Sequence, residues 1–176
     1  MKFDVAPVAI HVVVMGVAGC GKSAVGQRIA RYLNLPLIEG DDFHPARNIL
    51  KMQQGLPLTD ADRADWLQTL AAELFKQPKG AVLTCSALKS AYRESLRRGG
   101  LSLHFVHLAI TQAESLRRVS HRYGHFYPPS LVASQFEALQ EPTYEPRVLM
   151  LDGQLPLDEL AVQARRWLVD STNRNE

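Results

Sequence analysis

A glycine-rich run at residues 16–23 combines the residue types that bind a phosphate chain. It matches the pattern G-x-x-x-x-G-K-[ST] in full. In such a loop the backbone N–H groups cradle the phosphates, the lysine bridges the β- and γ-phosphates, and the hydroxyl after it holds Mg²⁺. The pattern therefore predicts a nucleoside triphosphate site, with Lys22 as the phosphate cation and Ser23 as a magnesium ligand. The loop residues that we expect to bind ATP are Gly16, Val17, Ala18, Gly19, Cys20, Gly21, Lys22 and Ser23.

The chain on either side of this loop has the pattern of a buried strand followed by a helix. Ile10–Met15 is apolar at all positions but one, which is typical of a strand in a parallel sheet. After Lys22 the apolar residues Val25, Ile29 and Leu33 recur every four positions, as they do on one face of a helix. A helix that begins at the loop points its N-terminus at the phosphates. The context therefore favours triphosphate binding over an ordinary glycine-rich turn.

Acidic residues follow a second short apolar segment, Leu37–Glu39. Glu39 and Asp41 are two positions apart, so on an extended chain their side chains point to the same side. Transfer of a phosphoryl group to an alcohol needs a carboxylate that orients the hydroxyl and accepts its proton, and a second carboxylate commonly supports Mg²⁺ through water. We interpret the pair as candidates for these two tasks, with Glu39 on the metal side. A solvated acidic turn is the alternative.

Several arginines are placed where they are able to bind an anion. Arg63 is expected in the first turn of a helix that begins at Thr59, where a positive charge is unfavourable unless an anion or a carboxylate compensates it. Arg118 and Arg122 are one helical turn apart, and both would converge on ATP when a lid formed by residues 117–129 closes. Solvated surface is the ordinary alternative for such side chains.

Strand and helix patterns alternate along the chain, which predicts an α/β fold with a parallel sheet covered by helices on both faces. Five strands are expected, at Ile10–Met15, Leu37–Glu39, Ala81–Cys85, Leu103–Ile110 and Arg147–Leu151. Ligands of such sheets bind at the carboxyl ends of the strands, where the motifs above fall. Residues 1–176 are expected to form one domain, in which 44–59 is a substrate-side insert and 117–129 is the lid.

Three helix starts have recognisable sequences. Thr59 and Thr111 each begin a capping-box-like run, and at Thr111 the carboxylate of Glu114 is placed to reach back to the cap. A last helix is expected to start near Pro156, because proline suits the first helical turn.

The composition is that of an ordinary globular protein, with 46% hydrophobic and 22% charged residues in a chain of 176. A net charge of +2 gives no general attraction to nucleic acid or to an anionic membrane, and no apolar stretch is long enough to span a bilayer. We therefore expect neither as a partner. Cys20 and Cys85 form no disulfide framework or zinc motif, and Met1–Asp4 lacks the apolar core of a signal peptide. These features predict a cytoplasmic protein with reduced thiols.

Four blocks of the chain carry more information than the phosphate loop alone. They are the loop at 16–23, the acidic segment 39–63, the segment Cys-Ser-Ala-Leu-Lys-Ser-Ala-Tyr-Arg at 85–93, and Gly-His-Phe at 124–126 followed by Ser-Gln-Phe-Glu-Ala-Leu-Gln-Glu-Pro at 134–142. Together they resemble the gluconokinases of the small, bacterial phosphate-loop type. The resemblance implies a P-loop NTPase fold of the nucleoside-monophosphate-kinase-like kind. It also implies ATP-dependent phosphorylation of D-gluconate on its terminal hydroxyl to give 6-phosphogluconate, with Mg²⁺, by a homodimer.

The resemblance further implies roles for individual residues. Asp41 matches the catalytic carboxylate of the family, and Lys22 and Arg122 are expected to act with it on the transferred phosphoryl group. Arg118 and Arg122 match lid arginines that bind ATP. The positions expected around the sugar acid are Asp41, His44, Arg47, Arg63, Lys89 and Gln135. The chain departs from the family at Asp65, where proline is common, a change that bears on the first helical turn rather than on the chemistry.

Two other functions stay open on the sequence. A phosphate-loop kinase of another small acceptor, such as a related sugar acid, shikimate or a nucleotide, would share the loop and the acid after the second strand. It would not need the blocks at 39–63 and 85–93. An ATP-binding switch without an acceptor would need no convergence of acids and arginines on the γ-phosphate.

Overall fold

The computed structural model describes residues 9–122 and 126–173, and its centre is a sheet of five parallel strands. The strand order is β2-β3-β1-β4-β5. The strands are β1 (Ile10–Met15), β2 (Leu37–Glu39), β3 (Gly80–Thr84), β4 (Leu103–Ala109) and β5 (Val148–Asp152). The predicted parallel five-stranded fold is confirmed, and the strand bounds differ from the expected ones by at most one residue.

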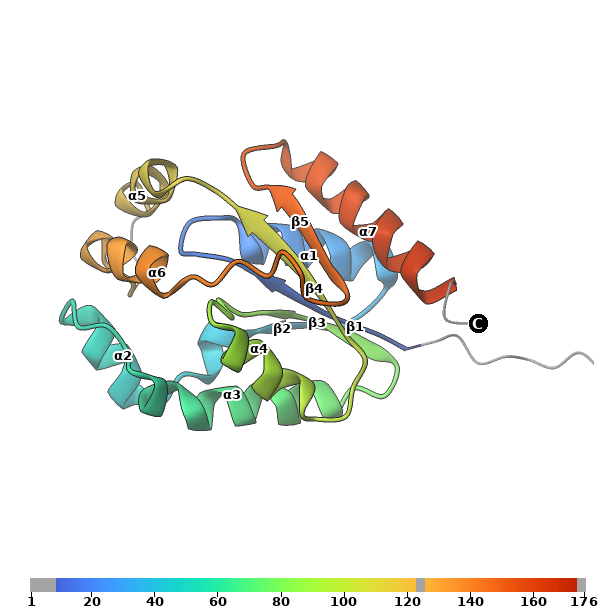
Figure 1. Cartoon of the computed structure of the whole chain (residues 1–176), viewed down its shortest axis with the longest axis horizontal. Helices are drawn as coiled ribbons and strands as arrows, with labels where there is room; N and C mark the ends of the chain where they lie inside the picture. The colour runs from blue at the N-terminus through green and yellow to red at the C-terminus, as the bar shows by residue number, and fades with distance from the viewer. Residues whose placement is uncertain (1–8, 123–125, 174–176) are drawn as a thin grey trace, which may run out of the picture.

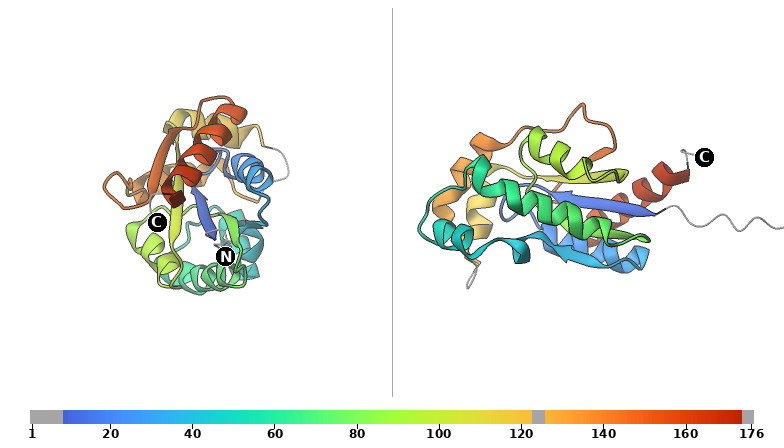
Figure 2. Two further views of the ribbon diagram at one scale, coloured as in Figure 1. Left: turned by 90° about the vertical axis from the view of Figure 1, so that its right-hand side faces the viewer. Right: turned by 90° about the horizontal axis from the view of Figure 1, so that it is seen from below.

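Helices cover both faces of the sheet (Figure 1). On one face lie α1 (Lys22–Leu33) and α7 (Leu157–Asn173), and on the other lie α3 (Asp60–Phe75) and α4 (Ser90–Arg97). The two further views in Figure 2 show the same three layers. Each helical layer packs against the sheet through its own hydrophobic cluster. The cluster under α1 and α7 includes Ile29 and Leu168, and the cluster under α3 and α4 includes Leu70 and Phe105.

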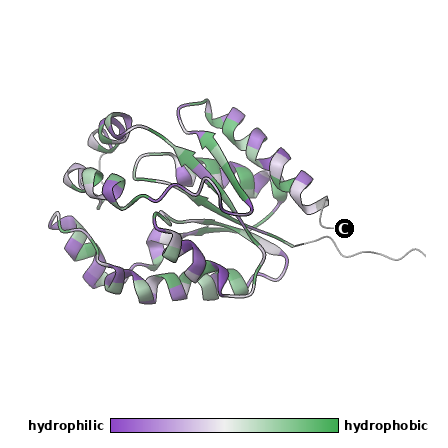
Figure 3. Cartoon of the chain, viewed as in Figure 1, coloured by the Kyte–Doolittle hydropathy of each residue, from purple (hydrophilic) through white to green (hydrophobic). Residues whose placement is uncertain are grey.

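The hydropathy of the chain follows this layering (Figure 3). The strands are mostly apolar, because a parallel strand between two helical layers is buried on both faces. The central strand β1 shows this most clearly, since Val12, Val13, Val14 and Met15 are fully buried. The helices are mixed, with apolar and polar residues alternating along each of them.

Shorter elements gather at the end of the sheet where the strands finish (Figure 1). They are the 3-10 turns η1 (Gly40–Phe43) and η2 (Pro129–Leu131) and the helices α2 (Ala46–Gln53), α5 (Gln112–Ser120) and α6 (Val132–Ala138). The predicted insert 44–59 contains α2, and the predicted lid 117–129 contains the end of α5. Residues 123–125 of that lid lie outside the described residues.

Two of the expected helix caps behave differently from each other. At Thr59 the capping box is complete: the hydroxyl of Thr59 accepts from the backbone N–H of Asp62 at 3.2 Å, and the Asp62 carboxylate accepts from the backbone N–H of Thr59 at 2.7 Å. At Thr111 the hydroxyl accepts from the N–H of Glu114 at 3.2 Å. The carboxylate of Glu114, expected to reach back to the cap, instead accepts from Arg117 and Arg118, because two guanidinium groups one helical turn away are stronger donors.

Candidate active site

A cavity of about 350 Å³ lies at the carboxyl ends of the strands, between the phosphate loop, η1 and the segment after residue 117. It brings together most of the residues that the sequence singled out. Those that line it are Ala18, Gly19, Gly21, Lys22, Ser23, Asp41, His44, Arg63, Arg118, Arg122 and Gln135. Segments more than 100 residues apart in sequence therefore share one wall, as the rule for parallel α/β sheets predicts.

The phosphate loop leads from β1 into α1 and has the backbone shape that an anion needs. Gly21 takes the left-handed conformation at φ 100° and forms the N-cap of α1, so the first N–H groups of the helix face the cavity. The ammonium group of Lys22 donates to the carbonyl oxygens of Gly16 and Val17, both at 3.1 Å, and so is held across the loop. Cys20 is buried behind the loop and does not line the cavity.

The carboxylate of Glu39 lies beside the hydroxyl of Ser23. Glu39 and Thr84 are register partners in neighbouring strands, and the Thr84 hydroxyl donates to Glu39 at 2.6 Å while the Ser23 hydroxyl donates to it at 3.0 Å. The next residue must be glycine, because a Cβ on Gly40 would lie 2.2 Å from the carbonyl oxygen of Thr84. Mg²⁺ prefers hard oxygen ligands and one or two carboxylates, so the donor set of Ser23 and Glu39 fits this ion.

Asp41 and His44 lie on the turn that follows β2. The imidazole of His44 stacks on the indole of Trp66, with ring centroids 4.1 Å apart and planes at 14°, and the Trp66 N–H donates to the carbonyl of Gly40 at 2.8 Å. The Asp41 carboxylate is about half exposed and lies 4.0 Å from His44 Nε2. Burial lowers the pKa of His44 to about 4, although the nearby Asp41 acts against this shift. His44 is therefore neutral at physiological pH.

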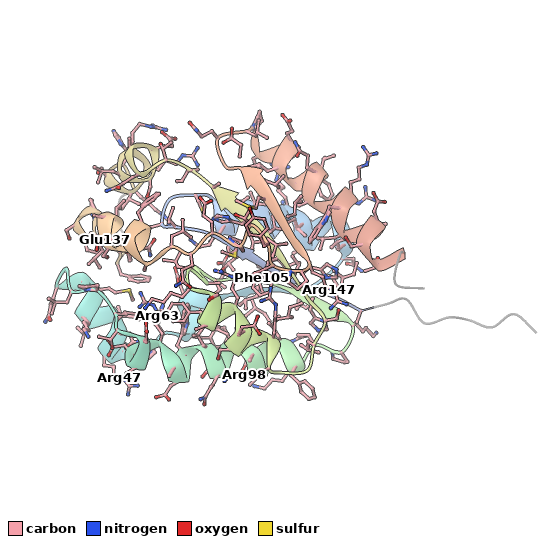
Figure 4. The ribbon with its side chains drawn as sticks, viewed as in Figure 1. Arg47, Arg63, Arg98, Phe105, Glu137 and Arg147 are labelled. Atoms are coloured by element: carbon pink, nitrogen blue, oxygen red, sulfur yellow. The ribbon has the colours of Figure 1, made fainter. Side chains whose placement is uncertain are left out.

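Arg63 is the cation on the acceptor side of the cavity. Its guanidinium donates to the carbonyl of Leu58 and, at 3.5 Å, to the hydroxyl of Tyr92. Within residues 9–122 and 126–173 no carboxylate forms an ion pair with it. In Figure 4 Arg63 lies on the side of α3 that faces the sheet, whereas Arg47, which belongs to α2, lies on the side away from the sheet. A guanidinium in the first turn of a helix, without a carboxylate partner and open to a cavity, is suited to an anionic ligand.

The structure does not bring Arg47 and Lys89 to the cavity lining. Arg47 is exposed and pairs with the carboxylate of Asp65 at 3.0 Å, which gives a partner to the residue that stands where the family commonly has proline. Lys89 pairs with Asp60 at 2.7 Å. Both cations therefore form ion pairs with surface carboxylates. Their roles as substrate ligands stay predictions.

The remaining predicted residues connect the phosphate loop to the segments that cover it. Gln135, in α6, accepts from the backbone N–H of Ala18 at 2.6 Å. Arg118 donates to the carbonyl oxygens of Gly19 at 3.3 Å and Gly153 at 3.1 Å. Both therefore hold the loop as well as line the cavity. Arg122, two residues after the end of α5, also lines it.

An apolar wall of the cavity was missed by the sequence analysis. Met52 and Leu58 of the insert pack with Leu131, and the side chains of Phe126 and Tyr127 pack against this cluster. The insert and the lid segment therefore contact each other through apolar side chains that form one wall of the cavity. The sequence indicates this wall only through the apolar residues of the insert 44–59 and of the lid segment 117–129.

Comparison with known proteins decides between the functions left open. The chain is 44% identical to the thermosensitive gluconokinase of Escherichia coli K12 over 133 residues, which are 74% of this chain and 71% of that protein. The crystal structure of a gluconokinase from Sinorhizobium meliloti 1021 is 42% identical, covers 94% of both chains and superposes with a TM-score of 0.86. This chain belongs to the gluconokinase family. No protein-family model matches it.

More distant structures share only the fold of this gluconokinase family member. A shikimate kinase from Aquifex aeolicus is 18% identical and superposes with a TM-score of 0.66. This likeness confirms the P-loop kinase fold and says nothing of the acceptor. The alternative acceptors are not favoured, because the relatives at high identity are gluconokinases. Among the described residues, no helix is long and apolar enough to cross a membrane.

Proposed function

We propose that this protein transfers the γ-phosphoryl group of ATP to the terminal hydroxyl of D-gluconate, giving 6-phosphogluconate and ADP. The observation that supports this most is the composition of one cavity. It joins a phosphate loop, the carboxylate of Asp41 and the guanidinium of Arg63, which has no ion-pair partner in the described part of the chain. A sugar acid has a hydroxyl at one end and a carboxylate at the other, so it needs both kinds of group.

The phosphate side of the reaction rests on the loop and the lid arginines. The N–H groups at the start of α1 and the ammonium of Lys22 would bind the β- and γ-phosphates. Arg118 and Arg122 line the same cavity and would neutralise the charge that develops on the transferred group. Of the two, Arg122 is the better placed to act on the γ-phosphate, because Arg118 also ties Gly19 to Gly153.

The metal side rests on Ser23 and Glu39. Their hydroxyl and carboxylate would hold Mg²⁺, and the ion would offset the negative charge that a nucleophile meets at the phosphates. Thr84 fixes the carboxylate of Glu39 through a 2.6 Å hydrogen bond, so the oxygen donors are already oriented.

The acceptor side rests on Asp41, His44 and Arg63. Asp41 would orient the terminal hydroxyl of gluconate and accept its proton as the oxygen attacks phosphorus. The neutral imidazole of His44 lines the cavity beside Asp41 and would bond a hydroxyl of the polyol. Arg63 would bind the carboxylate, and the apolar side chains of Met52 and Phe126 would keep out water, the competing acceptor.

We also propose that the protein acts in the cytoplasm as a homodimer. The support is the family resemblance, together with the two cysteines, which are buried free thiols rather than a disulfide. Burial raises the pKa of Cys85 to about 12, so this thiol is unreactive. Sedimentation velocity tests the assembly: the proposal requires the mass of two copies, and a monomer at micromolar concentration would refute it.

An acceptor panel tests the proposed reaction. ADP release from Mg·ATP is followed with D-gluconate, and in parallel with idonate, shikimate, glucose and AMP. Strong stimulation by gluconate is expected, because it carries both the hydroxyl that Asp41 would orient and the carboxylate that Arg63 would bind. Stimulation by shikimate or AMP instead would keep the kinase and refute the acceptor. No stimulation by any compound, with ATP still bound, would favour an ATP-dependent switch.

A further inference from the structure

A polar cluster lies directly behind Arg63, outside the residues that line the cavity. It consists of Tyr92 in α4, Asp60 in α3 and Lys89, the residue before α4. Tyr92 is almost completely buried, with 6% of its surface exposed. None of these three residues is among those that line the cavity.

The hydroxyl of Tyr92 has a fixed direction. It contacts a carboxylate oxygen of Asp60, and an ionised carboxylate only accepts hydrogen bonds, so Tyr92 is the donor. With its hydrogen committed to Asp60, the phenol oxygen presents a lone pair on its remaining side. The guanidinium of Arg63 lies on that side, with Nη1 3.5 Å from the phenol oxygen and Cζ 5.5 Å from the ring centroid.

Lys89 forms an ion pair with Asp60 and so compensates its negative charge. Its ammonium lies 2.7 Å from the Asp60 carboxylate and 5.6 Å from the ring of Tyr92. The hydrogen bond from Lys89, followed by that from Tyr92, lowers the pKa of Asp60, and burial raises the pKa of Tyr92. Together with Arg63, the cluster therefore contains one carboxylate, two cations and a protonated phenol at neutral pH. One positive charge, that of Arg63, is left over on the cavity side.

We infer that Tyr92 is a positioning residue: it orients the Arg63 guanidinium toward the carboxylate of the acceptor. Asp60 and Lys89 keep a lone pair of the Tyr92 phenol oxygen directed at Arg63. The Tyr92 ring and hydroxyl hold one edge of the guanidinium, and the carbonyl of Leu58 holds it as well. The remaining N–H groups are then presented to an anion in one orientation, which reduces the entropy lost on binding. This inference rests on the proposed function, because it assumes that the acceptor is a sugar acid.

The test is the variant Tyr92→Phe, which keeps the ring and removes only the hydroxyl. The matched control is Tyr144→Phe, because Tyr144 is 99% exposed. We expect the KM for D-gluconate to rise about 5- to 20-fold in Tyr92→Phe, the effect of one lost hydrogen bond in a charged network. The KM for ATP and kcat are expected to change little, since the phosphate loop is untouched. The control should match the wild type in every value.

A second variant asks whether Tyr92 acts through Arg63. In an Arg63→Lys background the guanidinium that Tyr92 orients is absent, so adding Tyr92→Phe should raise the KM for gluconate no further. Additive losses in the double variant would overturn the inference, as would an unchanged gluconate KM in Tyr92→Phe or a parallel rise in the KM for ATP. A wild-type enzyme without gluconate-dependent ADP release would instead refute the proposed function, so the two failures are distinguishable.

Discussion

The ion pair between Arg93 and Glu145 offers the sharpest prediction of stability. Arg93 is completely buried, and its guanidinium makes three hydrogen bonds to Glu145, at 2.6–3.0 Å. It donates three more to the carbonyl oxygens of Ala87, Leu88 and Gln140. The pair thus holds the loop after β3, which contributes Ser86 to the cavity, against the chain that follows α6.

Removing one partner of a buried ion pair leaves the other charge uncompensated. Glu145→Ala would take away half of the hydrogen bonds of a guanidinium that water does not reach. Such a loss costs about 3–5 kcal/mol. For a protein of this size, 1 kcal/mol shifts the melting temperature by about 2–4 °C, so we expect a fall of about 6–20 °C.

Thermal and urea unfolding measure this effect, with Glu141→Ala as the control. Glu141 is an exposed acid in the same segment, and its loss is expected to change stability by less than about 0.5 kcal/mol. A Glu145→Ala protein within 1 kcal/mol of the wild type would refute the reasoning, because it would show that Arg93 finds other partners or solvent.

The same pair predicts a dependence on pH. Burial alone would raise the pKa of Glu145, but hydrogen bonds from Arg93 and Arg97 hold it below its ordinary value of 4.5. A carboxyl with a depressed pKa in the folded state stabilises the protein above its unfolded pKa, and that contribution is lost as the pH falls. The difference between wild type and Glu145→Ala should therefore be constant from pH 6 to pH 8 and shrink below about pH 4.5. A difference that grows on acidification would contradict this assignment.

Three further predictions concern the cavity. Lys22→Ala is expected to lower kcat by about 10³-fold or more in steady-state assays, because it removes the cation on the transferred phosphate; a loss below tenfold would exclude that role. Asp41→Asn should lower kcat by about 10²–10⁴-fold with little change in the melting temperature, and near-normal turnover would remove Asp41 from the role of base. Because burial lowers the pKa of His44 to about 4, the profile of kcat/KM against pH should show no ionisation of this residue above pH 5. A limb near pH 6.5 that disappears in His44→Gln would show that the imidazole titrates.

Features set by local sequence were predictable from the sequence. The strand at Ile10–Met15 and the phosphate loop after it depend on short-range apolar patterning and on glycine geometry, and both are as expected. The capping box at Thr59 is likewise a local pattern of four residues. The position of Arg63 in the first helical turn even indicated its need for an anion, and the structure shows it at the cavity without a carboxylate partner among the described residues.

Features set by distant contacts were not predictable in the same way. A motif gives the position of Lys89 but not its pairing with Asp60, which depends on how α3 and α4 pack. The partner of Gln135, the N–H of Ala18, is 117 residues away in the sequence. The buried charge of Arg93 was also missed, because its pattern on a polar helix is that of a surface residue until Glu145 is brought to it.

The identity of the product tests the central claim most directly. The wild-type protein is incubated with Mg·ATP and D-gluconate labelled with ¹³C at C6, and the product is followed by ³¹P and ¹³C NMR. The account predicts one phosphomonoester whose phosphorus couples to the labelled C6, formed in equal amount to ADP. A phosphate on another carbon, or ADP formed with inorganic phosphate and no sugar ester, would contradict it.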